Sequence, residues 1–152
     1  MLHFIHAIVG VLIGTSFSSA WLIALLAIVS HFLLDIIPHR DSLFTKKDFA
    51  EFDGKIPNNK KAIMLEVIDS ILGILVIVYF YIMLKNPLII LGAFFSLFPD
   101  MIKLLYLTPI RNSSIFKGYV NFHTNIQKEI GYFFGILTQM IIFILAYLAI
   151  VF

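Results

Sequence analysis

The sequence predicts an all-α fold: a polytopic membrane bundle of about five helices with a polar site at one end. Two observations support this class. Of the 152 residues, 61% are hydrophobic and 13% are charged, and the mean hydropathy is +0.99, whereas soluble domains are roughly 45–50% apolar and about 25% charged. The apolar residues fall into long runs that polar segments interrupt. At this length we expect residues 1–152 to form a single integral membrane domain.

The residue types present narrow the chemistry. The chain has no cysteine, which excludes disulfides, thiolate metal sites and cysteine nucleophiles. A zinc site would therefore have to use histidine and carboxylate ligands. The sequence contains no phosphate-binding loop, serine triad or dinucleotide motif, and we expect no nucleic-acid partner.

The first helix is expected at about residues 3–16. This segment begins without Lys or Arg, which favours a membrane helix over the alternative, a signal peptide cleaved near Ser18-Ser19-Ala20. Gly10 and Gly14 have the spacing of closely packed membrane helices. At about 1.5 Å per residue the helix barely crosses a hydrocarbon core of ~30 Å, so tilted, partly buried and re-entrant placements all remain open.

The second helix, at about residues 20–37, has the length of a membrane span and ends where Pro38 breaks the backbone bonding. Asn86-Pro87 forms a tight turn before the fourth helix, and Pro99 removes one backbone hydrogen bond in the second half of that helix and is expected to kink it. The remaining elements are expected at these residues: helices 61–84, 87–107 and 123–151, and polar loops 38–60 and 108–122.

Alternating spans bring the ionisable side chains to one end of the bundle. The second and fourth helices end where the first, third and fifth begin, and this end receives the following candidates: His6, His31, Asp35, His39, Glu66, Asp69, Asp100 and His123. Of the 11 Lys and Arg residues, only Lys85 falls at the opposite end. The positive-inside rule then places the N-terminus and the polar end on the cytoplasmic side of the cell (inner) membrane.

Several of these side chains lie deep in apolar segments. An ionised carboxylate within hydrocarbon costs about 2.5–3.5 kcal/mol, and Asp35, Asp69 and Asp100 come from different helices. They would repel one another unless some were protonated or all shared a cation. Histidines at the same depth favour a shared metal ion over the alternative, a purely hydrogen-bonded cluster. Lys103, one turn beyond Asp100, is an alternative partner for that carboxylate.

The segment from His31 to Asp41 is the densest in candidate ligands. His31 and Asp35 are one helical turn apart and share a face. Pro38 then turns the chain, and His39 and Asp41 follow in the exit segment. An imidazole and a carboxylate at this spacing can bind one divalent ion.

Two carboxylates, Asp41 and Glu66, are candidates for a general base in catalysis. Asp41 has the alternative role of capping a short helix, and Glu66 that of pairing with a neighbouring lysine. His123 has the alternative role of an interfacial histidine, although Gln127 lies one turn further on and makes the same face polar.

Four motifs resemble those of a family of small prokaryotic membrane proteins regarded as metal-dependent hydrolases. The most specific is SHFLLDIIPHRD at residues 30–41, which resembles the family signature SHxxLDxxPHxD. In the same order along the chain, HAIVG at residues 6–10, GAFFSLFPD at 92–100 and FHTNIQ at 122–127 resemble the family segments HxxxG, GAxxxxxPD and FHxxxQ.

The resemblance implies a metal centre, because that family is thought to be distantly related to the zinc-dependent phospholipases C and the single-strand zinc nucleases. Those helical proteins hold a zinc cluster for phosphoester hydrolysis through His and Asp side chains. The implied ligands are His6, His31, Asp35, His39, Asp69, Asp100 and His123. About one to three divalent ions suit this set, with Zn²⁺ favoured and Mn²⁺ or Mg²⁺ as alternatives.

We therefore expect a membrane-embedded, metal-dependent hydrolase that acts on a phosphoester through a metal-activated water. The buried location suggests a lipid-linked substrate that enters from the cytoplasmic interface. A metal ion or proton carrier is the first alternative, because transport pathways also use intramembrane acids and histidines. The second alternative is a non-catalytic membrane assembly subunit. The confinement of the polar residues to one end favours a one-sided pocket over a transport path.

Overall fold

The computed structural model describes residues 1–40 and 60–152, and every regular element among these residues is a helix. The predicted all-α class is therefore confirmed for the described part of the chain. Its elements are the α-helices α1 (His3–Ser16), α2 (Ala20–Ile36), α4 (Lys60–Leu84), α5 (Leu88–Lys103), α6 (Ser114–Ile126) and α7 (Tyr132–Val151), and the short 3₁₀-helices η1 (Leu104–Leu107) and η2 (Pro109–Asn112).

The predicted last helix is the main difference between sequence and structure. Residues 123–151 form parts of two helices, because α6 ends at Ile126 and α7 begins at Tyr132. Between them the chain is extended and pairs with His39, whose N–H donates to the carbonyl of Lys128 at 3.0 Å and whose carbonyl accepts from Ile130 at 3.1 Å. The predicted loop 108–122 consequently contains η2 and most of α6.

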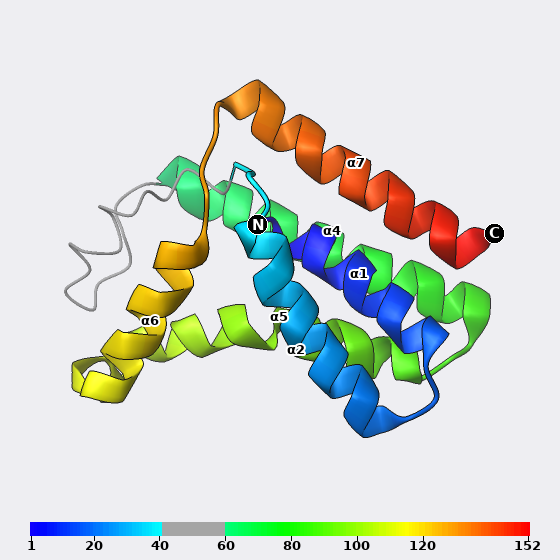
Figure 1. Cartoon of the computed structure of the whole chain (residues 1–152), viewed down its shortest axis with the longest axis horizontal. Coiled ribbons are helices and arrows are strands. Elements are labelled where there is room, and N and C mark those ends of the chain that lie inside the picture. Colours follow the sequence, from blue (N-terminus) through cyan, green and yellow to red (C-terminus); the bar gives the residue numbers. More distant parts are fainter. Residues whose placement is uncertain (41–59) are drawn as a thin grey trace.

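The helix α1 lies at the centre of the bundle (Figure 1) and contacts α2, α4, α5 and α7. In Figure 1, α1, α4 and α7 run in one direction, and α2 and α5 run back. The ends of α2 and α5 consequently lie at the same end of the bundle as the start of α1. The short helix α6 contacts α2 at this end.

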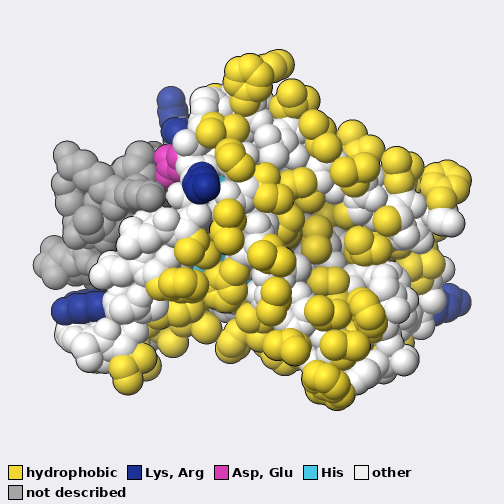
Figure 2. All heavy atoms as spheres, in the orientation of Figure 1, with side chains coloured by type: hydrophobic (Ala, Val, Ile, Leu, Met, Phe, Trp, Pro, Cys, Tyr) yellow, Lys and Arg dark blue, Asp and Glu magenta, His cyan; other side chains and the backbone are white. Residues whose placement is uncertain are grey.

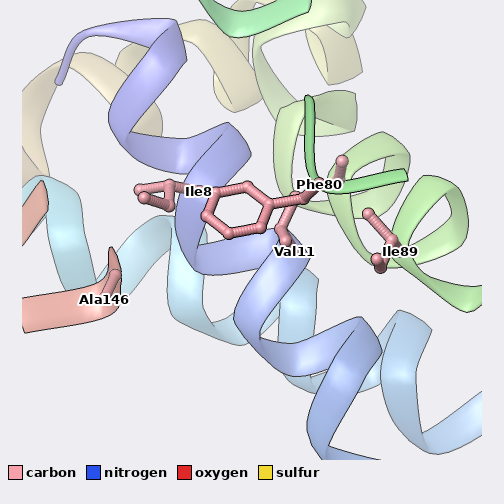
Figure 3. Close-up of a cluster of buried hydrophobic side chains, with 6 residues drawn as sticks. Ile8, Val11, Phe80, Ile89 and Ala146 are labelled. Carbon is pink, nitrogen blue, oxygen red and sulfur yellow. The ribbon is translucent and has the colours of Figure 1, made fainter. Parts of the chain in front are cut away.

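The apolar core joins α4, α5 and α7 to the central helix α1. Figure 3 shows its buried side chains, Ile8 and Val11 from α1, Phe80 from α4, Ile89 from α5 and Ala146 from α7. Dispersion contacts among close-packed side chains are individually small and collectively large. This cluster therefore holds α4, α5 and α7 against the central helix.

The helices α1 and α5 cross at backbone contact, as the spacing of Gly10 and Gly14 predicts. A Cβ atom added to Gly10 would lie 2.6 Å from the carbonyl oxygen of Gly92. A Cβ atom on Gly14 would overlap the carbonyl oxygen of Leu88, and one on Gly92 would overlap that of Gly10. Only glycine fits at this crossing.

Among the described residues, two helices are long and apolar enough to cross a membrane, Ile63–Leu84 in α4 and Tyr132–Val151 in α7. Only 17% of the 18-residue apolar stretch of each helix is buried inside the structure, and Figure 2 shows many hydrophobic side chains spread over the face in view. The helices α1 and α2 are apolar but shorter. Exposed apolar surface on this scale is typical of a protein that contacts a membrane or a partner.

The glycine crossing gives a test of the packing. We expect Gly92→Ala to lower the free energy of unfolding by about 1–3 kcal/mol, because the added methyl group overlaps the backbone of α1. Thermal unfolding of the detergent-solubilised protein, followed by circular dichroism, measures the change. The matched control is Gly118→Ala in α6, where an added Cβ would meet nothing within 4 Å. Equal melting temperatures for the two variants would contradict the close α1–α5 crossing.

Candidate metal centre

Five ionisable side chains converge where α1 begins and where α2 and α5 end. We call this set the His–Asp cluster, and its members are His6 of α1, His31 and Asp35 of α2, Asp100 of α5 and His123 of α6. The three histidines and Asp35 are fully buried, and the side chain of Asp100 is 11% exposed. Buried groups of this kind are costly unless they are paired or bind a metal ion.

The first part of the cluster consists of His31, Asp35 and His123. The Nε2 atoms of His31 and His123 lie 2.8 Å apart. Asp35 Oδ2 lies 3.5 Å from His31 Nε2 and 3.4 Å from His123 Nε2. The one-turn spacing of His31 and Asp35 places both on the same face of α2, as predicted. One donor atom from each residue lies within 4.8 Å of the others, so the three could hold one metal ion.

The second part of the cluster consists of His6, His31 and Asp100, whose donor atoms also lie within 4.8 Å of one another. Asp100 Oδ1 lies 4.0 Å from His31 Nε2. The ring of His6 stacks on that of His31 with centroids 4.1 Å apart, and His6 Nε2 lies 3.3 Å from Asp35 Oδ1. Because His31 belongs to both parts, the cluster is continuous.

The proton position on His31 follows from its neighbour on α5. His31 Nδ1 lies 2.8 Å from the carbonyl oxygen of Ser96, which can only accept a hydrogen bond. We therefore assign the proton to Nδ1, which leaves the lone pair of Nε2 directed at His123 and Asp35. The hydroxyl of Ser96 in turn donates to the carbonyl of His6 at 2.8 Å. A backbone carbonyl that fixes the tautomer in this way is typical of metal-binding histidines.

Several buried imidazole nitrogens of the cluster make no hydrogen bond in the described part of the chain. Nδ1 of His6 and Nδ1 of His123 are buried without a hydrogen-bond partner in the described part of the chain, and His6 Nε2 has the Asp35 carboxylate 3.3 Å away. Neutral imidazole nitrogens are strong ligands for Zn²⁺ and similar ions. Imidazole and carboxylate donors in one buried place are therefore a ligand set that could hold a borderline divalent cation.

Asp35 lies at the centre of the cluster and has further polar neighbours. The α-ammonium group of Met1 lies 2.8 Å from Asp35 Oδ1. The side-chain amide of Gln127, one turn beyond His123, donates to Oδ2 at 3.3 Å. The carboxylate therefore has a cationic neighbour and a hydrogen-bond donor in addition to the imidazoles of the cluster.

The helix α6, which is not one of the two membrane-length helices, presents His123 and Tyr119 to the cluster. Burial, with a smaller contribution from the charge of Lys103, lowers the pKa of His123 to about 4. The imidazole is therefore neutral near pH 7, the state that a metal ligand requires. Burial also raises the pKa of Tyr119, and its hydroxyl donates to the carbonyl of Pro99.

Asp100 also forms the ion pair with Lys103 that was predicted as an alternative. Lys103 Nζ lies 2.7 Å from Asp100 Oδ1. The same oxygen lies 3.7 Å from His123 Nε2, so the pair is at the edge of the cluster and not apart from it. Lys103 therefore balances one of the carboxylate charges.

Asp69 lies beside the cluster but belongs to neither group of candidate ligands. Its Oδ2 accepts from the backbone N–H of His3 at 2.6 Å, and its Oδ1 accepts from that of Phe4 at 3.2 Å. It thus satisfies free N–H groups at the start of α1, the role of a helix cap supplied from another helix. Its assignment as a metal ligand stays a prediction.

His3 and Glu66 form the rim of the site. His3 Nε2 lies 3.5 Å from Glu66 Oε1 and 3.7 Å from Asp100 Oδ2. The side chains of His3 and Glu66 are 22% and 37% exposed. The rim is thus a more exposed acid–base pair, and His3 brings it next to the buried cluster at Asp100.

His39, another predicted ligand, does not belong to the His–Asp cluster. The residue is buried, with Nδ1 2.7 Å from the carbonyl of Ile37. Its backbone holds the extended segment between α6 and α7. The candidate base Asp41 lies outside the described residues.

Sequence reasoning did not single out Ser96 or the α-ammonium group of Met1. A signal for Ser96 exists, because it precedes Asp100 by one helical turn and so shares a face with it. The polar face of Gln127 was recognised, but His123 was expected in the first turn of the last helix. The structure places it in the last turn of α6 instead.

Comparisons with protein-family models, with curated proteins and with solved structures give no match for this chain.

The geometry of the cluster predicts metal binding that depends on Asp35. We expect the purified protein to retain about one to three Zn²⁺ ions per chain, and Asp35→Asn to bind Zn²⁺ at least about tenfold more weakly. Elemental analysis and competition with a zinc-binding dye measure these quantities, and circular dichroism checks folding.

The control for this measurement is Glu129→Gln. Glu129 does not belong to the cluster, and its carboxylate pairs with the guanidinium of Arg40, with 3.5 Å between the two groups. This variant should keep the zinc content and affinity of the unaltered protein. A folded, unaltered protein that stays free of metal after reconstitution with Zn²⁺ would show that the cluster is only a hydrogen-bonded network.

Proposed function

We propose that this protein is a membrane-embedded, metal-dependent hydrolase that cleaves a phosphoester, carried by a lipid, at the cytoplasmic membrane face. The observation that carries the proposal is the His–Asp cluster, in which imidazoles and carboxylates from four helices meet in one buried place. Groups of this kind are expensive inside a helical bundle and mark functional sites.

Membership of the resembled hydrolase family is part of the proposal. Each of the four motifs contributes to the cluster: HAIVG contributes His6, SHFLLDIIPHRD contributes His31 and Asp35, GAFFSLFPD contributes Asp100, and FHTNIQ contributes His123. Residues that are far apart in the sequence are thus neighbours in space, which supports a shared role for the four motifs.

The membrane location is supported by the outward faces of α4 and α7. Both are of spanning length, and both leave most of their apolar surface outside the core. The core helix of a soluble protein would be mostly buried. We therefore propose that α1, α2, α4, α5 and α7 lie in the bilayer and that α6 lies at the membrane surface. The Ser113 hydroxyl caps the start of α6.

Zn²⁺ is the proposed cofactor, because imidazole and carboxylate are its usual ligands where no thiolate is present. His31, Asp35 and His123 would hold one ion, and His6, His31 and Asp100 form the second group that could hold one. When bound, a divalent ion lowers the pKa of a water ligand towards ~7 and offsets the charge of a phosphoryl oxygen.

The residues of the rim complete the proposed chemistry. Glu66 is the candidate general base among the described residues, and His3 lies 3.5 Å from it. A proton accepted by the Glu66 carboxylate can pass to His3 Nε2 and then to solvent, because both side chains are partly exposed. Lys103 lies beside Asp100 and can pair with a phosphate oxygen.

Hydrolysis of phosphoesters tests the proposal. In detergent micelles with Zn²⁺, we expect phosphate or alcohol release from phosphatidic acid, phosphatidylglycerol or a polyisoprenyl phosphate, and none from Asp35→Asn. Glu66→Gln should lower kcat by about 10²–10⁴-fold while leaving the zinc content unchanged, because it removes a base and not a ligand. Glu129→Gln should keep full activity.

Other results would reject the hydrolase. If none of these lipids nor 4-nitrophenyl phosphate is hydrolysed, and proteoliposomes take up Zn²⁺ or protons in a manner that Asp35→Asn abolishes, the protein is a carrier. If neither hydrolysis nor uptake occurs, the cluster serves assembly or packing.

Cysteine labelling tests the proposed orientation. Because the sequence contains no cysteine, each introduced cysteine is the only thiol that the reagent can label. We expect a membrane-impermeant maleimide to label Lys85→Cys in intact cells, because Lys85 follows α4 at the end opposite the cluster. Lys117→Cys in α6 should be labelled only after the cells are permeabilised. The reverse labelling pattern would place the cluster on the outer side of the membrane.

A further inference from the structure

An apolar groove lies between the two membrane-length helices. Its volume is about 510 Å³, and its walls come from α4 and α7, with Phe4 of α1 between them. On α4 it is lined by Leu72 and Val76, and on α7 by Met140 and Phe143. A cavity of this size is in the range of ligand pockets.

The groove is open on its outer side. Leu72 is 43% exposed and Met140 is 40% exposed, although both belong to its lining. Almost all lining groups are hydrocarbon, so ordered water would find few hydrogen-bond partners there. If α4 and α7 cross the bilayer, this opening faces hydrocarbon, and the natural occupant is a hydrocarbon chain.

One end of the groove lies beside the proposed catalytic site. Phe4 lines the groove, and its backbone N–H donates to Asp69 Oδ1 at 3.2 Å. The residue before it, His3, lies 3.7 Å from Asp100 of the His–Asp cluster. Gly73 of α4, one residue beyond Leu72, lies opposite the start of α1, where an added Cβ would be 3.6 Å from the Phe4 backbone.

The other end of the groove lies deeper along the same helices. Tyr79 of α4 and Tyr147 of α7 line it there, about 10 and 15 residues beyond Asp69 and Tyr132, and a helix rises about 1.5 Å per residue. The groove therefore leads from the polar end towards the interior of the proposed bilayer. This is the path that the chain of a lipid follows when its headgroup stays at the interface.

We propose that the groove between α4 and α7 binds one hydrocarbon chain of a phosphate-bearing membrane lipid and so places the phosphate at the His–Asp cluster. This inference rests on the proposed function for the membrane location and for the phosphate at the cluster. It adds the position of the lipid's hydrocarbon chain. It also implies that α4 and α7, by binding this hydrocarbon chain, favour lipids over water-soluble phosphoesters as substrates.

Photo-crosslinking tests the groove directly. The probe is a phosphatidic acid with a diazirine on one acyl chain, reconstituted with the protein in phosphatidylcholine vesicles, and adducts are located by mass spectrometry. We expect adducts to concentrate on groove residues such as Leu72, Val76 and Met140. Val76→Trp, which fills the groove, should reduce these adducts at least fivefold.

The matched control is Ile74→Trp, because Ile74 lies on the same helix, is 59% exposed and does not line the groove. Its adduct yield should equal that of the unaltered protein. Adducts spread evenly over the outer face of α4, or an unchanged yield in Val76→Trp, would overturn the proposal. A change of oligomeric state in Val76→Trp, measured by light scattering, would also overturn it and assign the groove to a second copy of the chain.

Hydrolysis measured in the same vesicles separates the two proposals. Adducts in the groove without phosphate release would keep the lipid-binding groove and reject the hydrolase. Release from 4-nitrophenyl phosphate and phosphatidic acid at rates that Val76→Trp does not change, together with dispersed adducts, would keep the hydrolase and reject the groove.

Discussion

The buried carboxylate of Asp35 is the constraint on which the polar end of the molecule depends. It has no exposed surface, and an uncompensated charge at such a place would be costly. The α-ammonium group of Met1, 2.8 Å from Oδ1, and the side-chain amide of Gln127, which donates to Oδ2, offset this cost. His6, His31 and His123 each bring Nε2 within 3.3–3.5 Å of a carboxylate oxygen. The positions of α1, α2 and α6 are thereby tied to one side chain, and the same groups are the ligands that a divalent ion prefers.

The rest of the bundle makes that arrangement possible. The glycines of α1 and α5 allow backbone contact, which brings the Ser96 carbonyl to His31 Nδ1 and the Ser96 hydroxyl to the carbonyl of His6. The backbone of His39 pairs with the extended segment between α6 and α7. Because the two helices are separated there, α6 can place His123 in the cluster while α7 packs against α1. Apolar packing, close backbone contact and a buried polar cluster thus act on the same few helices.

Part of this could be predicted from the sequence, because some of the features have a local signal. The apolar runs predicted the first four helices, and the i, i+4 spacing of His31 and Asp35 predicted one wall of the site. The division of residues 123–151 could not be predicted, because the pairing that interrupts the helix is with His39, far away in sequence. The capping contact of Asp69 was missed for the same reason: depth in an apolar segment marks it as functional without showing that its partners are backbone N–H groups.

The central claim is that imidazoles and carboxylates of the His–Asp cluster hold a metal ion together. X-ray absorption at the zinc edge of the reconstituted protein measures the ligand shell directly. The account predicts nitrogen and oxygen ligands at about 2.0–2.2 Å with the outer scattering of imidazole rings, and weaker imidazole scattering in His123→Gln. A shell of oxygen atoms alone, or a spectrum that His123→Gln leaves unchanged, would contradict it.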